Sequence, residues 1–430
     1  MEFVKSSPHS SKLTSNFIKT SFGNILEWYD FSLYGLFVVQ ISNTFFPNHN
    51  QFISILLTLL TFAIGFIARP IGGIIFGHIG DKYGKHYSVN LAVWFMVIPT
   101  VLVSIIPSYN SLGILAPVIL VLLRILQGIS AGGQFSGLIT IAVEASIPKR
   151  SLFVGLVHAI AVLGSLIASL IGLVSLKLIS FNSGYTSESL FWRIPFLFSG
   201  VLFIVYLKLR PDITIIENKG HRFSFWEIFK KQPTELFCMI CMSASTGCLY
   251  YILFTYFMTF MQIHLLYSYT KALVIMNILY FISIFAYPGM GYIADKIGKR
   301  VTFGKIMTVV FLCISPLMFF VTQNVYLLLL VMLVLVVSFC SIASTMTSLY
   351  AEVFSIPYRM TSCSIAWNCG LVISGFAPMI SEILVRETKF GIILMPMLIS
   401  IFILYLQRKI VRSDGFIKFN KKSADSGIII

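Results

Sequence analysis

Several ionisable side chains lie within long apolar stretches of this 430-residue chain, where a charge is costly. Glu27 and Asp30 are three residues apart in the stretch 23–35, so they share one face of a helix. Arg124 needs an anionic partner at its depth, and either of these carboxylates can supply it. Arg69 either binds an anionic group of a substrate or joins this network as a partner of Glu27.

A carboxylate beside an arginine can take up and release a proton when its burial and its distance from the arginine change. We therefore predict a proton-coupling site made of Asp30, Glu27 and Arg124, with Asp30 as the first choice of carboxylate and Glu27 as the second. The alternative is a structural ion pair without a proton role. His158, in a later apolar run, is a further candidate for a relay, although a lone helical histidine is more often a packing residue.

Aromatic residues make up 15% of the chain, and several of them fall in apolar runs that can line a cavity. A cage of aromatic rings suits a quaternary ammonium group. The simpler interpretation of most of these rings is packing or contact with lipid. The candidates for substrate binding are Arg69, Trp28, Tyr29, Tyr34, Gln134, Tyr250, Tyr251 and Trp367.

A short charged pattern, G-x-x-x-D-K-x-G-K, occurs twice, at 77–85 and at 291–299. The copies are separated by about half of the chain, and each lies in a break between apolar runs. A repeat of this kind predicts two related helix bundles with a substrate path between them. The residues of this gating motif are Gly77, Asp81, Lys82, Gly84, Lys85, Gly291, Asp295, Lys296, Gly298, Lys299 and Arg300.

We predict that the repeated motif is a latch on the inner side of the membrane. Gly77 and Gly291 permit close approach of helices, and Asp81 and Asp295 can lie at a helix N-terminus or pair with a cation. Such contacts can close the inner side in one conformation and break in the other. The alternative is a solvated loop that only sets topology. A second repeat, at the inner ends of two apolar runs, adds Glu144, Arg150, Glu352 and Arg359 as candidate partners.

Long apolar runs make up most of the chain, which is 57% hydrophobic, 11% charged and has a mean hydropathy of +0.90. A soluble domain carries roughly twice that share of charge. Runs of about 20 apolar residues cross a bilayer as helices, and their continuity excludes barrel strands. The predicted spans are 18–45, 53–76, 88–107, 112–142, 152–176, 191–209, 236–262, 270–292, 302–321, 324–350, 360–385 and 389–407.

The net charge of +15 is distributed unevenly over the loops between these spans, and this asymmetry predicts that both termini are cytoplasmic. The predicted organisation is an N-terminal segment 1–17, a six-helix bundle 18–209, a cytoplasmic linker 210–235, a second six-helix bundle 236–407 and a basic tail 408–430. Of the 31 Lys and Arg residues, those in the predicted outside loops are Lys177, Arg193, Lys271, Arg386 and Lys389.

Patterns that mark catalytic or metal centres are missing from the sequence: we find no His-Glu-x-x-His, Walker-type or Rossmann glycine motif. Cys238 and Cys241 have redox-motif spacing, but they open an apolar run, where packing is the better interpretation. We therefore expect no enzymatic activity, no catalytic residue, no cofactor and no metal. The expected partners are a small-molecule substrate, protons and the lipid bilayer, without nucleic acid, and the expected state is a monomer.

These motifs together resemble the major facilitator superfamily and, within it, the metabolite:H+ symporter family. The resemblance lies in the two loop motifs, in the stretches 23–35, 68–73, 124–133 and 191–196, and it covers about residues 18–408. It implies an all-α integral membrane protein with 12 transmembrane helices in two pseudo-symmetric bundles, a site near the midplane, and proton-coupled uptake across a bacterial inner membrane. Substrates in that family include proline and betaine, α-ketoglutarate, citrate and shikimate.

The chain departs from the family pattern at Gln134, where Gly-Gly-Glu is common, so one intramembrane carboxylate is missing. Three hypotheses remain. The first is a proton symporter for an osmolyte of the proline or betaine type, working by alternating access. The second is a symporter for a di- or tricarboxylate, with Arg69 and Arg124 holding the anion. The third is a non-transporting membrane receptor, against which the retained Glu27, Asp30 and Arg124 argue.

Overall fold

The computed structural model describes residues 8–145, 149–181, 191–209, 230, 232–321, 324–354, 359–388 and 390–411. Within these ranges the regular elements are helices throughout. Nine helical stretches of the described ranges are long and apolar enough to cross a membrane. The prediction of an all-α membrane protein is therefore confirmed. The predicted linker 210–235 and tail 408–430 lie mostly outside the described residues.

The helices before residue 210, here called the first half, cover the first six predicted spans. Three of these spans are interrupted, each as a pair of consecutive helices. The helices are α1 (Pro8–Leu36), α2 (Val38–Phe45), α3 (Gln51–Ile67), α4 (Arg69–Tyr83), α5 (Lys85–Ile105), the short α6 (Tyr109–Leu112), α7 (Leu115–Ala131), α8 (Gln134–Ala145), α9 (Arg150–Phe181) and α10 (Arg193–Leu209).

The helices after residue 232, the second half, cover the other six predicted spans. One of them contains a π-helical turn, η2, which leads into the last turns of that span. The elements are α12 (Pro233–Tyr251), η2 (Ile252–Tyr256), α13 (Phe257–Ile263), α14 (Tyr269–Ile297), α15 (Arg300–Ile314), α16 (Leu317–Val321), α17 (Val325–Val353), α18 (Arg359–Gly375), α19 (Ala377–Glu387) and α20 (Gly391–Val411).

The helix boundaries extend beyond the predicted spans at several ends. The first helix begins at Pro8, well before the predicted start at residue 18. Proline is favourable in the first turn, where its missing N–H has no helical acceptor to lose. The polar residues that follow it carry no apolar signal, so hydropathy alone detects the membrane-spanning part and not the whole helix.

Of the three breaks within spans of the first half, two occur at proline or glycine, and the third is at Phe37. Pro70 follows the first residue of α4, and Gly132 and Gly133 separate α7 from α8. Proline lacks the N–H that would continue the helical ladder, and glycine has little helix propensity. Interrupted backbone is tolerated at membrane depth only where protein buries it. Both of these breaks lie at Arg69, whose ion pair is described below.

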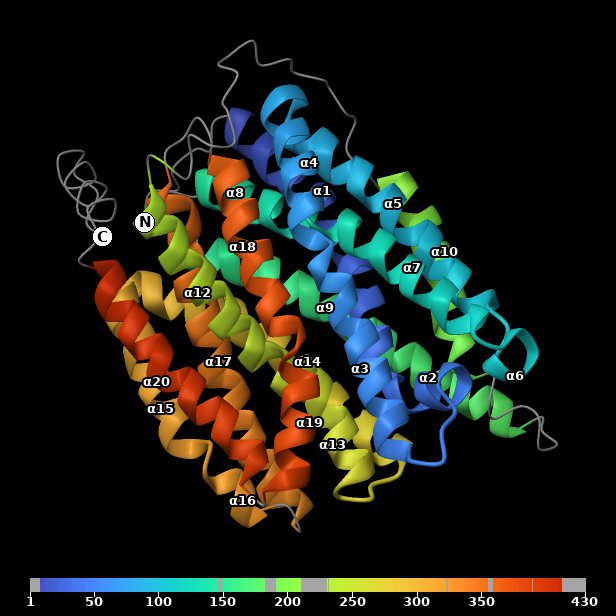
Figure 1. Ribbon diagram of the computed structural model, residues 1–430. Helices are drawn as coiled ribbons and strands as arrows, with labels where there is room; N and C mark the ends of the chain where they lie inside the picture. Colours follow the sequence, from blue (N-terminus) through green and yellow to red (C-terminus); the bar gives the residue numbers. More distant parts are fainter. Residues whose placement is uncertain are drawn as a thin grey trace.

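The two halves lie side by side, as the blue-to-green and yellow-to-red helices of Figure 1 show. The largest contacts between them are those of α9 with α14 and of α4 with α18. At Gly291 of α14 an added Cβ would lie 2.3 Å from the carbonyl oxygen of Ser151 on α9. The backbones therefore meet directly there, as small residues allow in membrane helices.

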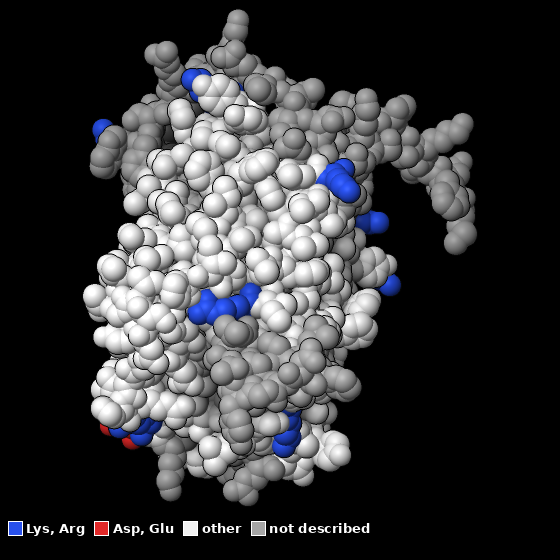
Figure 2. Space-filling view, turned by 90° about the vertical axis from the view of Figure 1, so that its right-hand side faces the viewer, with Lys and Arg blue, Asp and Glu red and all other residues white. Residues whose placement is uncertain are grey.

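The surface turned toward the viewer in Figure 2 carries only a few, widely separated charged side chains. Large apolar side chains of α5 are exposed, including Phe95 and Ile98, each with 56% of its surface accessible. An exposed apolar surface of this extent requires an apolar surrounding such as lipid. Polar side chains that are buried instead, within and between the two halves, are the ones that can carry a function.

Candidate functional site

The first buried ion pair joins Glu27 of α1 to Arg69 at the start of α4. Arg69 Nη2 donates to Glu27 Oε1 at 2.8 Å, and both side chains are buried, with 1% or less of their surface exposed. Arg69 also donates to the carbonyl oxygen of Ala131 at 3.3 Å, at the break between α7 and α8, and through Nε to Asn368 Oδ1 at 3.2 Å. Glu27 Oε2 has no hydrogen-bond partner among the described residues.

The second buried ion pair joins Asp30, one turn further along α1, to Arg124 of α7. Arg124 Nη1 lies 3.3 Å from Asp30 Oδ2. Asp30 Oδ1 accepts from Gln127 Nε2 at 2.7 Å and from Thr100 Oγ1 at 2.9 Å. The guanidinium of Arg124 lies 4.0 Å from the centre of the Tyr34 ring, within cation–π range. Both oxygens of Asp30 therefore have partners, and all of these partners belong to the first half.

The structure thus decides the pairing that the residue types left open: Arg124 pairs with Asp30, and Arg69 pairs with Glu27. Sequence reasoning missed the neutral partners. Gln127 stands three residues after Arg124 and so shares its helix face, which is a signal that could have found it. Thr100 and Asn368 are isolated polar residues in apolar runs and carry no such signal.

An aromatic cavity lies between the halves, beside the Glu27–Arg69 pair. Trp28 meets Tyr250 edge to face, with ring centres 5.0 Å apart. The volume of the cavity that the centre of a water molecule can occupy is about 20 Å³. This is room for about one water. A solute the size of proline or betaine requires it to widen. The lining residues are Trp28, His158, Thr246, Gly247, Tyr250, Tyr251, Tyr287, Phe339, Ala343, Thr347, Trp367 and Leu371.

Three buried donors of this lining lack acceptors among the described residues: the indole N–H groups of Trp28 and Trp367 and the hydroxyl of Tyr251. Buried polar groups are normally hydrogen-bonded, so each exception needs an explanation. A bound acceptor group is one. The lining contains no Asp, Glu, Lys or Arg within the described part of the chain.

The remaining substrate-binding candidates lie outside the cavity lining. Tyr29 donates its hydroxyl to the carbonyl oxygen of Pro195, and Tyr34 donates to that of Thr58 at 3.1 Å. These two hydroxyls join helices of the first half. Arg69 is occupied by Glu27 and Asn368, and Gln134 is fully buried near Gly23. Tyr29 directly follows the lining residue Trp28, and consecutive residues of a helix face different neighbours.

His158 of α9 does line the cavity. Its Nε2 lies 3.3 Å from Thr347 Oγ1, and its ring stacks on Tyr287 with centres 4.9 Å apart. The imidazole of this first-half residue thus contacts α17 and α14 of the second half. This arrangement agrees with packing as well as with a relay.

Four of the predicted latch residues, Asp295, Arg300, Arg150 and Glu352, form one charged cluster at the end of the molecule that the sequence predicts to be cytoplasmic, here called the inner end. The carboxylate of Asp295 accepts from the backbone N–H groups of Ser151 and Leu152, at 3.2 and 2.9 Å, at the N-terminus of α9. An anion is favourable at that end of a helix. Glu352 Oε1 accepts from Arg150 Nη1 at 3.1 Å and from Arg300 Nη1 at 2.7 Å. The cluster therefore joins the first half to the second.

The other copy of the motif is described only in part, because the side chains of Asp81 and Lys85 lie outside the described residues, as do those of Glu144 and Arg359 from the second repeat. Gly77 faces Thr361 of α18, where an added Cβ would lie at an ordinary 3.4 Å from Cα. The glycines that close the two motifs end α4 and α14 with positive φ, 105° at Gly84 and 71° at Gly298, which favours glycine. Lys82 and Lys296 stand in the last turns of α4 and α14, and Lys299 precedes α15.

Two contacts lie at the opposite end of the second half. Glu382 of α19 is buried and accepts from Tyr256 Oη at 3.0 Å, and His264 Nε2 lies 3.1 Å from the same oxygen. Nearby, Val38, Ile55 and Leu59 of the first half pack with Ile263 and Met379 of the second. Both ends of the path between the halves are therefore closed by contacts.

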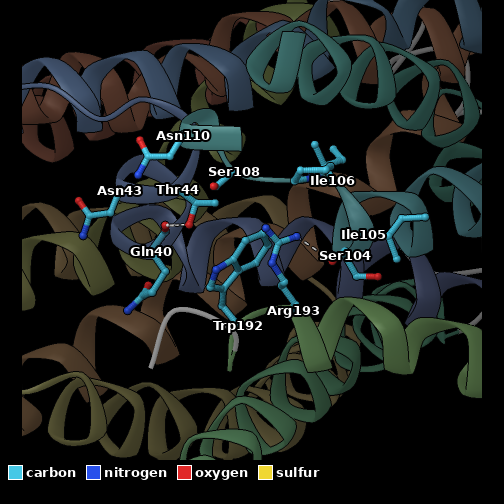
Figure 3. Close-up of a pocket in the computed structure, with 11 residues that line it drawn as sticks. Gln40, Asn43, Thr44, Ser104, Ile105, Ile106, Ser108, Asn110, Trp192 and Arg193 are labelled. Atoms are coloured by element: carbon cyan, nitrogen blue, oxygen red, sulfur yellow. Dashed lines mark hydrogen bonds between the residues drawn. The ribbon is translucent and has the colours of Figure 1, made fainter. Parts of the chain in front are cut away.

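A larger pocket, of about 730 Å³, opens among α2, the end of α5, α6 and the start of α10 (Figure 3). Arg193 lies in it, donating Nη1 to the carbonyl oxygen of Ser104 at 2.8 Å and resting 4.6 Å from the centre of the Trp192 ring. Gln40, Asn43 and other neutral polar side chains complete its wall. None of the predicted site residues lies in this pocket.

The sequence matches the family model described as Major Facilitator Superfamily over residues 20–378. The chain belongs to this superfamily of membrane transporters. It is 29% identical over 402 residues to a proline/betaine transporter of Escherichia coli (strain K12), covering 88% of this chain and 79% of that protein. It is 28% identical over 387 residues to the glycine betaine/proline/ectoine/pipecolic acid transporter OusA of Dickeya dadantii (strain 3937), covering 85% of this chain and 76% of that one.

Solved structures show the same fold. A structure of the proton:xylose symporter XylE bound to 6-bromo-6-deoxy-D-glucose superimposes with a TM-score of 0.73 at 16% identity, covering 94% of this chain and 96% of that one. A bacterial homologue of the human lysosomal transporter Spinster, inward-facing and unoccupied, gives 0.63 at 14% identity, covering 96% and 99%. The predicted superfamily and its fold, which implies twelve membrane helices, are confirmed, and the protein is a multi-pass membrane transporter.

Proposed function

We propose that this protein carries a small zwitterionic solute of the proline and betaine type into a bacterium together with protons. The observation that carries the proposal is the cavity lining, which combines aromatic faces with three unpartnered donors, those of Trp28, Trp367 and Tyr251. A carboxylate can accept hydrogen bonds from these donors. The ammonium end of the same solute can rest against aromatic faces such as those of Tyr250 and Phe339.

The charges around the cavity favour a neutral zwitterion over a di- or tricarboxylate. The lining carries no cation in the described part of the chain. Arg69 and Arg124, the two arginines that could hold an anion, are already paired with Glu27 and Asp30. A solute with two or three negative charges would need a cation there, because a buried unpaired charge is strongly unfavourable. The names of the relatives, which are transporters of proline and betaine, support the same substrate class.

The two ion pairs of α1 supply the proton site of the proposal, and their surroundings favour Glu27 over Asp30 as the carrier. Glu27 keeps one oxygen free, and its partner Arg69 touches the second half. Asp30 has both oxygens satisfied within the first half. A carboxylate can exchange a proton during transport only if the motion of the halves changes its surroundings, and that condition is met at Glu27.

Alternating access follows from the contacts at the two ends. Opening the inner side requires Asp295 to leave the N-terminus of α9 and Glu352 to leave Arg150. Opening the other side requires Ile263 and Met379 to separate from the apolar cluster of Val38, Ile55 and Leu59. Because both ends are closed and the cavity is small, the structure corresponds in this proposal to an occluded form. Rocking of the two halves then exposes the cavity to one side of the membrane at a time.

The proposal includes the topology expected from the distribution of basic residues. Both termini, the linker 210–235 and the tail 408–430 lie in the cytoplasm, and the bundles 18–209 and 236–407 are the units that rock. The protein works as a monomer in the inner membrane. The motif residues at 77–85 and 291–299 form the inner latch.

The test is uptake of labelled betaine, proline and α-ketoglutarate into proteoliposomes under an inward proton gradient, with and without protonophore. We expect betaine or proline to accumulate and the protonophore to abolish the accumulation. Liposomes without the protein control for leakage of solute through the bilayer. Uptake of α-ketoglutarate alone would contradict the zwitterion and favour the carboxylate hypothesis. Transport of none of the three would favour the non-transporting receptor.

A further inference from the structure

A single amide of the second half enters the Glu27–Arg69 network. Asn368 of α18 is fully buried, and its Oδ1 accepts from Arg69 Nε at 3.2 Å. Its Nδ2 donates to the carbonyl oxygen of Gly132, at the break between α7 and α8, and to that of Ser364 in its own helix at 2.8 Å. The amide therefore accepts a hydrogen bond from the first half and donates one back to it.

The packing leaves this amide little freedom to move alone. An added Cβ on Gly73 of α4 would lie 2.8 Å from Asn368 Nδ2. Because the side chain fits closely between α4 and the break before α8, its bonds to Arg69 and Gly132 persist only while α18 stays against the first half. Separation of α18 from α4 must break them.

Asn368 is also the neighbour of a cavity residue. Trp367 lines the aromatic cavity, and the next residue reaches Arg69. The first half repeats this arrangement on α1, where Trp28 lines the cavity and the preceding Glu27 pairs with Arg69. Each half thus presents one indole to the cavity and one polar side chain to the same guanidinium.

We propose that Asn368 is a positioning residue that couples movement of α18 to the protonation of Glu27, an inference that rests on the transport function proposed above. When α18 moves away, Arg69 Nε loses its acceptor, and a buried N–H without an acceptor is unfavourable. The guanidinium then turns toward other acceptors, and Glu27 Oε2 is a carboxylate oxygen of the described network that has no partner. The charge state of Glu27 thereby depends on whether solute holds Trp367, and with it α18, in place.

Three other titratable groups lie around Glu27, and none of them forms a described hydrogen bond to Arg69. Asp30 lies one turn along α1 and is held by Arg124, and Tyr251 approaches from α12. His158 of α9 lies across the cavity, against Thr347 and Tyr287. Among the described residues, Asn368 is the one that bonds directly to Arg69 from the second half.

The test compares two activities of Asn368→Leu, a substitution of similar shape without hydrogen bonds, in proteoliposomes. Proton-driven accumulation of betaine requires coupling, whereas exchange of betaine at equal concentrations requires only binding and movement. We expect accumulation to fall by about tenfold or more while exchange stays within about threefold of wild type. Asn368→Asp, which keeps an acceptor for Arg69, should restore part of the accumulation. Equal loss of both activities in Asn368→Leu would overturn the proposal.

Asn24→Leu is the matched control, because Asn24 is an equally buried amide whose Nδ2, among the described residues, bonds within the first half, to the carbonyl oxygen of Val157 at 3.1 Å. Its ratio of accumulation to exchange should equal that of wild type; a ratio lowered as much as in Asn368→Leu would overturn the specific role of Asn368. If Asn368→Leu is not recovered folded, Asn368→Ser is measured in its place. A ratio of accumulation to exchange equal to that of wild type would then overturn the proposal.

A substrate-free measurement separates this inference from the substrate proposal. Tryptophan fluorescence of the purified protein, titrated with pH, reports on Trp28 and Trp367 beside the network. We expect a step that Glu27→Gln removes and whose midpoint differs by about one pH unit or more between wild type and Asn368→Leu. This result would support the role of Asn368 even if wild type carries none of the solutes tested. Absence of the step in wild type, or identical midpoints, would overturn it.

Discussion

The two ion pairs of α1 have the same chemistry and different surroundings. Asp30 and Arg124 are enclosed by Thr100, Gln127 and the ring of Tyr34, all from the first half. Glu27 and Arg69 lie one turn away, at two helix breaks, and exchange a hydrogen bond with the second half. A closed network holds one bundle together whatever the other bundle does, whereas a shared network changes when the bundles move. The difference indicates which pair is structural and which can switch.

The largest effect should come from breaking the enclosed pair. Arg124→Met leaves Asp30 buried without its cation, and removal of one partner of a buried pair costs about 3–5 kcal/mol. We expect little folded, monodisperse protein in detergent, measured by size-exclusion chromatography. The double variant Asp30→Asn with Arg124→Met, which leaves no unpaired charge, should recover most of the folded fraction. A single variant as stable as wild type would remove the structural role of this pair.

A second prediction extends the comparison to the cluster at the inner end, which also joins the halves. Glu352→Gln weakens the contacts to Arg150 and Arg300 in the closed inner side. Loss of a charge-assisted bond of this kind is worth about 1.5–3 kcal/mol. We expect a cysteine placed at Ser151 to react several-fold faster with a thiol reagent in Glu352→Gln than in the otherwise native chain. Unchanged reactivity would show that the cluster does not hold the inner side closed.

The smallest predicted effect concerns the unpartnered donors of the cavity. Trp367→Phe keeps an aromatic face and removes the N–H, so the KM for betaine should rise by about fivefold, the equivalent of about 1 kcal/mol for one hydrogen bond. Trp192→Phe is the matched control, because Trp192 is also buried and its N–H also lacks an acceptor among the described residues, but it lines the larger pocket of Figure 3. Its KM should not change, and an equal rise in both variants would contradict the assigned cavity.

Much of the architecture could be predicted from the sequence, since apolar runs and repeated charged loops report directly on membrane spans and on internal symmetry. The pairing of Arg124 could not be decided, because Glu27 and Asp30 share a helix face and only the arrangement of α1 against α4 and α7 separates them. Neutral partners such as Asn368 remained hidden, since one amide in an apolar run has no pattern. The orientation of Tyr34 away from the cavity likewise depends on helix packing.

The most direct test of the account is proton movement during betaine uptake in Glu27→Gln, measured in proteoliposomes with a pH-sensitive dye inside. We expect exchange of betaine to persist while protons no longer enter with the solute, since the carboxylate that switches has been removed. The double variant Asp30→Asn with Arg124→Met is the parallel control, and it should still move protons with betaine. Proton movement that survives in Glu27→Gln and disappears in the double variant would contradict the account and assign the proton to Asp30.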